Sequence, residues 1–148
     1  MSEEVTEKIR SVGYCIYSAR FWQLYGLMVL SNVFLTFFSY SFKPYGETIE
    51  PHPPISDYTL SWAASIGSGI INALARIAMG AAIDKVGFKK LFTGLMVIQL
   101  INSLICYWAA FYPSMYVTCI LVNYWCSGGT FAIFPIAVVN VFGLDTGP

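Results

Sequence analysis

The chain has 148 residues, of which 57% are hydrophobic and 11% charged, with eight basic and eight acidic side chains. Soluble domains carry about 25% charged residues, so this composition excludes an ordinary soluble domain. Zero net charge, with no stripe of lysines that could follow a phosphate backbone, argues against a nucleic-acid partner.

Residues 1–20 form a polar tail that precedes the first apolar segment. The tail mixes acidic and basic side chains, and the apolar run behind it exceeds the apolar region of about 7–15 residues in a signal peptide. We therefore expect this tail to remain on the mature chain, with the apolar run as a first membrane anchor.

Long runs without charge predict four membrane-spanning helices. Phe21–Phe42 and Thr59–Ala75 are charge-free, and so is Leu91–Leu144, which is too long for one helix and should break at Pro113. The expected helices cover about 21–42, 59–83, 91–111 and 115–141, followed by a short C-terminal end at 142–148. Because only helices or closed barrels satisfy the backbone in hydrocarbon, the fold class is all-α, multi-pass, with the lipid bilayer as a partner.

Basic residues predict the orientation of these spans. Six lie before the first span or between the second and third, whereas Lys43 is the one basic residue between the first and second. By the positive-inside rule, the N-terminus and the C-terminal end should be cytoplasmic.

The second predicted span contains a ridge of small and polar residues and one charge, Arg76. The ridge repeats every four residues: Ala64, Ser68, Asn72, Arg76, Gly80 and Asp84. We expect it to face the helix bundle, where such residues permit close approach and hydrogen bonds. Arg76 should reach toward the cytoplasmic end and join the charges around Asp84, with substrate contact and lipid-headgroup contact as alternatives.

No arrangement of residues suggests catalysis, so we expect a protein that is not an enzyme and has no cofactor. The four cysteines, Cys15, Cys106, Cys119 and Cys126, lack the spacing of metal ligands. No metal site is predicted, and these cysteines are expected to be packing residues.

The segment from Gly80 to Lys90, Gly-Ala-Ala-Ile-Asp-Lys-Val-Gly-Phe-Lys-Lys, resembles the loop between helices 2 and 3 of the major facilitator superfamily. It departs from that motif at Phe88, where the superfamily has a basic residue. Arg20–Leu24 and Cys126–Pro135 resemble the oxalate/formate antiporter and monocarboxylate transporter branch of the superfamily.

This resemblance implies that the chain is the N-terminal third of a twelve-helix secondary transporter that moves small organic anions, such as monocarboxylates, by alternating access. The fragment would not transport alone and would need missing C-terminal helices or other subunits. The resemblance also implies a cytoplasmic gate formed by Gly80, Asp84, Lys85, Gly87, Lys89 and Lys90. Asn32 and Asn123, on the first and fourth spans, become candidates for lining the cavity, and Gln99 and Asn102 for interhelical hydrogen bonds.

Two alternatives need no missing helices. The chain could be a self-sufficient four-helix exporter that works as a dimer, although the first span lacks the acidic residue on which small multidrug exporters depend. It could also be a membrane adaptor that packs on other proteins through Ser68 and Asn72.

Overall fold

The computed structural model describes residues 16–48 and 55–142, and every regular element in those ranges is a helix. The elements are α3 (Ala19–Thr48), α4 (Asp57–Ile66), the π-helical turn η1 (Gly67–Ile71), α5 (Asn72–Val86), α6 (Phe88–Ala109) and α7 (Pro113–Phe142). Because α4, η1 and α5 follow one another without a break, four helical segments are long and apolar enough to cross a membrane. The prediction of an all-helical chain with four such segments is confirmed. Most of the predicted N-terminal tail and C-terminal end lies outside the described residues.

Helix α3 continues past its predicted end at Phe42 to Thr48. The predicted end was placed at the first charge, Lys43, but a helix of 30 residues is about 45 Å long and exceeds a hydrocarbon core of about 30 Å. Lys43 therefore lies on a polar extension beyond the apolar span. There it pairs with Asp57 at the start of α4.

The two short turns follow from one glycine and one proline. Gly87 has a φ of 84°, which favours glycine, and its amide caps α5 by donating to the carbonyl of Ile83 at 2.9 Å. Pro113 begins α7, two residues before the predicted start, because a proline in the first turn loses no intrahelical hydrogen bond.

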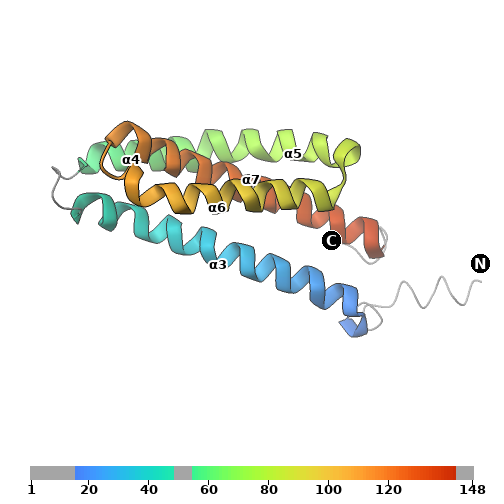
Figure 1. Cartoon of the computed structure of the whole chain (residues 1–148). Coiled ribbons are helices and arrows are strands. Elements are labelled where there is room, and N and C mark those ends of the chain that lie inside the picture. The colour runs from blue at the N-terminus through green and yellow to red at the C-terminus, as the bar shows by residue number, and fades with distance from the viewer. Residues whose placement is uncertain (1–15, 49–54, 143–148) are drawn as a thin grey trace, which may run out of the picture.

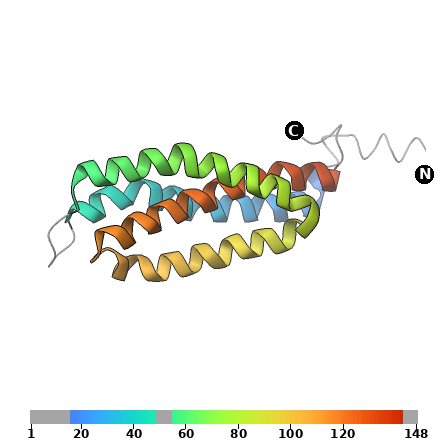
Figure 2. The same cartoon turned by 90° about the horizontal axis from the view of Figure 1, so that it is seen from above.

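Helix α7 lies at the centre of the bundle and packs on α3, α4, α5 and α6 (Figures 1 and 2). The glycine pair in α7 permits this close packing. A Cβ atom on Gly128 would clash with the carbonyl oxygen of Asn72, and one on Gly129 would lie 3.0 Å from Leu95. The glycine pair therefore permits the close α5–α7 and α6–α7 contacts.

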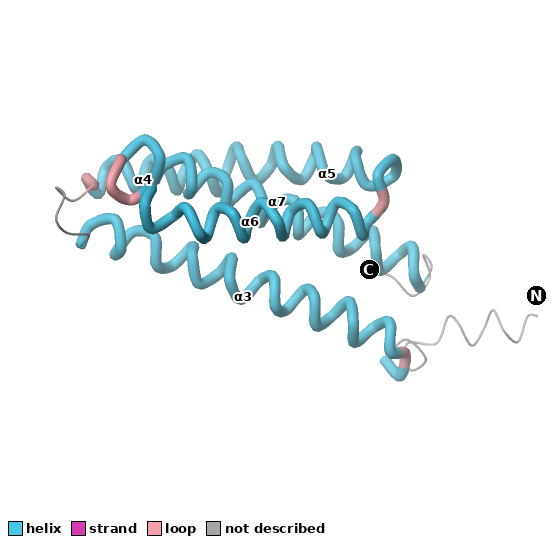
Figure 3. Tube along the Cα trace, viewed as in Figure 1, coloured by secondary structure: helices cyan, strands magenta, loops and turns pink. Residues whose placement is uncertain are grey.

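Apolar side chains form two clusters along α7. One lies at the end where α3 meets α4 and includes Phe38, Leu60 and Tyr116. The other lies toward the opposite end and includes Ile83, Leu95, Cys126, Ile133 and Phe134. Figure 3 shows the same arrangement as a trace, with α3 diverging from α5 and α6 toward its N-terminal end.

Candidate functional site

A row of polar side chains follows one side of the α4–η1–α5 segment, and we call it the polar track. Its members are Asp57, Ser61, Ser65, Ser68, Asn72 and Arg76, at intervals of three or four residues. All six are exposed or half-buried. The track crosses the charge-free run that the sequence identified as part of the second span.

One end of the polar track, which the predicted orientation places away from the cytoplasm and which we call the outer end, is an ion pair between Lys43 and Asp57. Ser61 joins it, because its hydroxyl donates to Asp57 at 3.4 Å and accepts from Lys43 at 3.5 Å. Both charged groups lie beyond the apolar parts of their helices. The hydrogen bond and the charge of Lys43 lower the pKa of Asp57, and the same contacts raise the pKa of Lys43. The acidic charge of the track is thus neutralised at this end.

The inner end of the polar track is Arg76, which is held on two sides. Its Nε donates to the side-chain oxygen of Asn72 at 2.9 Å, and its guanidinium carbon lies 5.7 Å from the ring centre of Phe131 on α7. Asn72 is itself fixed, because its side-chain nitrogen donates to the backbone carbonyl of Tyr124 at 3.4 Å. These contacts involve both α5 and α7, and they orient the guanidinium at the surface of the bundle.

Arg76 does not adopt the arrangement expected from the sequence. It pairs with Asn72, four residues earlier in the chain, and does not extend toward Asp84, which makes no ion pair with any other described residue. Sequence reasoning identified the charge of Arg76 but missed the ring of Phe131 as its neighbour. The sequence offered one signal for the observed contacts of Arg76: Asn72 lies four residues earlier and therefore on the same helix face.

The ridge predicted from the sequence faces the bundle only in part, because Asn72 bonds to α7 and Arg76 lies against the ring of Phe131. The residues of η1 and α5 that are buried are Gly67, Ala75 and Ile83, whereas Ser68, Arg76 and Asp84 are exposed. A separate exposed side of the same segment is apolar and consists of Ile70, Leu74 and Ile77. The segment therefore has a buried side, an apolar side suited to lipid, and a polar track that suits neither an apolar interior nor lipid.

The residues of the predicted gate surround the turn between α5 and α6. Asp84, Lys85, Lys89 and Lys90 are exposed there, Gly87 makes the turn, and a Cβ on Gly80 would meet no atom within 4 Å. Phe88, which replaces a basic residue of the motif, packs on the rings of Phe92 and Phe134 at 5.6 and 5.4 Å between centroids. Phe88 thus anchors the turn to α7 through apolar contacts. The gate role itself stays a prediction.

The two predicted cavity residues occupy different environments. Asn32 is half-buried and donates to the carbonyl of Met28 on its own helix at 2.8 Å. Asn123 is fully buried, accepts from Gln99 at 2.9 Å and donates to Ser39 at 3.4 Å. Asn123 therefore joins α3, α6 and α7 inside the bundle, and its cavity role stays a prediction. Gln99 and Asn102 make the interhelical bonds expected of them.

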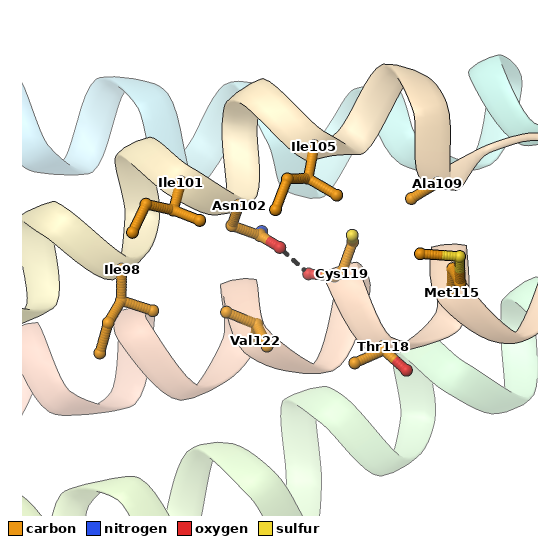
Figure 4. A pocket seen from close by; sticks show the side chains of 9 residues that line it. All are labelled: Ile98, Ile101, Asn102, Ile105, Ala109, Met115, Thr118, Cys119 and Val122. Atoms are coloured by element: carbon orange, nitrogen blue, oxygen red, sulfur yellow. Dashed lines mark hydrogen bonds between the residues drawn. The ribbon is translucent and has the colours of Figure 1, made fainter.

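A groove of about 360 Å³ lies between α6 and α7 (Figure 4). Its lining is apolar except for Thr118 and Asn102, and the side-chain nitrogen of Asn102 already donates to the carbonyl of Cys119 at 3.1 Å. The groove holds no charged group that could bind an anion. Within the described ranges, no three His, Cys, Asp or Glu side chains come together as metal ligands.

Comparison with known proteins gives one match. Over 153 residues the chain is 28% identical to Apicoplast pyruvate carrier 1 of Toxoplasma gondii. The match covers 97% of this chain and 27% of the relative, so the chain spans about a quarter of the relative's length. No family model matches, and no solved structure matches.

These findings correct the assignment to the major facilitator superfamily. No family model matches the chain, and the relative that does match is named as a pyruvate carrier, without reference to that superfamily. The motif between α5 and α6 is short, and Phe88 there serves packing where a charge was expected. The assignment is withdrawn, together with the correspondence to helices 1–4 of a twelve-helix transporter. The chain is an all-helical protein with four potential membrane spans that is similar to a pyruvate carrier.

Proposed function

We propose that this chain takes part in carrying a small solute, a monocarboxylate such as pyruvate, across a membrane. The observation that carries the proposal is the similarity to a pyruvate carrier over 97% of the chain. Four helices of sufficient length and apolarity support it. The polar track adds a surface of hydroxyl, amide and guanidinium groups within an otherwise apolar segment, as a path for a polar solute requires.

With the superfamily assignment withdrawn, the four-helix alternative takes precedence over a fragment of a twelve-helix transporter. In this alternative, copies of the chain suffice for transport. The adaptor alternative has no comparable support, because Asn72 is committed to Arg76 and Tyr124 and does not offer a free amide to a partner.

Uptake of labelled pyruvate into proteoliposomes that contain the purified chain tests the proposal. We expect saturable uptake that unlabelled pyruvate and lactate suppress and glucose does not. Uptake at the rate of protein-free liposomes would contradict the proposal. A chain cross-linked as a dimer that retains uptake would support the four-helix alternative, and loss of uptake on dilution to one chain per vesicle would show that one copy is insufficient.

A further inference from the structure

Arg76 is the one charged residue in the interior of the second predicted span, and it is exposed. An arginine at the centre of a membrane span costs about 2.5–3.5 kcal/mol on insertion scales, and such residues usually face a partner or a water-filled path. The apolar face of the same segment, Ile70, Leu74 and Ile77, is the side suited to lipid. The side that carries Arg76 therefore faces something other than lipid.

The contacts of Arg76 use its Nε and one face of its guanidinium group. Nε donates to Asn72 and the ring of Phe131 lies against the group. Within the part of the chain that the structure describes, no acceptor is bonded to the two terminal nitrogens, and no carboxylate forms an ion pair with Arg76. A guanidinium that is fixed in this way presents a planar pair of donors that fits the two oxygens of a carboxylate.

The charges on the polar track favour an anion at the inner end and not at the outer end. The nearest acidic residue along the helix in one direction is Asp84, eight residues or about 12 Å away. In the other direction it is Asp57, whose charge Lys43 neutralises. Arg76 is thus an uncompensated positive charge at the end of a row of hydroxyl groups.

We infer that the terminal nitrogens of Arg76 bind the carboxylate of the carried solute, with Asn72 and Phe131 as positioning residues. The inference rests on the proposed function and names the group that recognises the substrate class. Ser65 and Ser68 lie on the path by which a small carboxylate approaches Arg76 from the outer end. Phe131 also supplies an apolar surface for the remainder of a short organic acid.

Direct binding of labelled pyruvate to the full chain in phosphatidylcholine nanodiscs tests this inference, with uptake into proteoliposomes measured in parallel. We expect Arg76→Gln to weaken binding by about tenfold or more, because it removes the charge and the paired donors. Arg76→Lys should recover only part of the loss, since an ammonium group offers no planar pair. Neutral pyruvamide should not compete with pyruvate.

Arg20→Gln is the matched control, because it removes the same charge from the exposed start of α3. It should change binding by less than about twofold, within the range of an exposed substitution. Size-exclusion elution and thermal unfolding of each variant establish that it is folded. Phe131→Leu keeps an apolar contact but removes the ring, and it should weaken binding less than Arg76→Gln does.

Each outcome separates the inference from the proposed function. If folded Arg76→Gln binds and transports pyruvate as the unsubstituted chain does, the inference is overturned and the proposed function stands. If the unsubstituted chain binds pyruvate through Arg76 but shows no uptake, the inference stands and the proposed function fails. If anionic phosphatidylglycerol displaces pyruvate stoichiometrically, Arg76 holds a lipid phosphate and the inference is overturned.

Discussion

Polar side chains occur in two contrasting environments in this molecule. One group lies at the contact of α6 with α7, and the other is the polar track on the α4–η1–α5 segment. Gln99, Asn102 and Asn123 are buried, and each bonds to another helix. The serines of the track at Ser65 and Ser68 are exposed, and each donates to the backbone of its own helix. Polar residues that join helices hold the bundle together, whereas polar residues that are satisfied within one helix leave a surface available to a ligand. Substitutions in the two regions should therefore affect stability and transport differently.

The largest expected effect on stability is that of Asn123→Ala. The substitution removes the bonds to Gln99 and Ser39 and leaves the buried Gln99 amide without a partner. We expect a loss of about 3 kcal/mol in the free energy of unfolding, because an unsatisfied buried group costs about 1–3 kcal/mol beyond the cavity that is created. Unfolding in mixed micelles with increasing sodium dodecyl sulfate measures it. Asn140→Ala, at an exposed position of the same helix, is the control, and equal losses in the two variants would refute this view of the α6–α7 contact.

Gly128→Ala should have the next largest effect. The new Cβ would clash with the carbonyl oxygen of Asn72, and such overpacking costs about 1–3 kcal/mol. The matched variant is Gly80→Ala, where a Cβ meets no atom within 4 Å. Gly80→Ala should stabilise the helix by about 0.5–1 kcal/mol, because alanine loses less backbone entropy than glycine. Opposite shifts of the unfolding midpoint confirm the α5–α7 contact, and shifts of the same sign would contradict it.

Removing hydroxyl groups from the polar track should change stability little. We expect the double variant Ser65→Ala, Ser68→Ala to unfold within about 0.5 kcal/mol of the unsubstituted chain, as exposed substitutions usually do. Its initial rate of pyruvate uptake should nevertheless fall. The same unfolding and uptake assays measure both quantities. A large loss of stability with unchanged uptake would show that the track is structural.

The smallest effect expected is a dependence of stability on pH from the pair of Lys43 and Asp57. The lowered pKa of Asp57 means that its contribution is present above about pH 3.8, its ordinary pKa, and is lost as pH falls through the lower folded-state value. The raised pKa of Lys43 means that its contribution is present below about pH 10.5 and is lost as pH rises through the higher folded-state value. Between these limits the pair should contribute no pH dependence. Subtracting the thermal melting profile of Lys43→Gln from that of the unsubstituted chain isolates the contribution, and a slope near neutral pH would contradict it.

Periodicity and charge in the sequence predict the four helices, because a run of apolar residues has few alternatives in hydrocarbon. The environments of individual side chains are harder to predict from the sequence. Asn123 was assigned to a cavity on the basis of a family resemblance, whereas its position opposite Gln99 depends on how α6 packs on α7. The ridge was expected to face inward because its residues are small and polar, but only part of it contacts α7. The orientation of Arg76 could not be predicted, since Phe131 is distant in sequence and only the α5–α7 packing brings it near.

The π-helical turn at Gly67–Ile71 sets the rotational phase between the two halves of this segment. A π-turn holds more residues than a turn of α-helix, so it offsets the drift of a row spaced by four residues and keeps Arg76 in line with Asp57. Deleting one residue from this turn would restore a regular α-helix with nearly the same phase after it. If all five residues instead formed regular α-helix, everything after them would rotate by roughly 90° relative to α4. Ala75 would then leave α7, and the guanidinium would point to a different side of the bundle. The winding of these five residues, more than their chemistry, therefore decides which way the guanidinium of Arg76 faces.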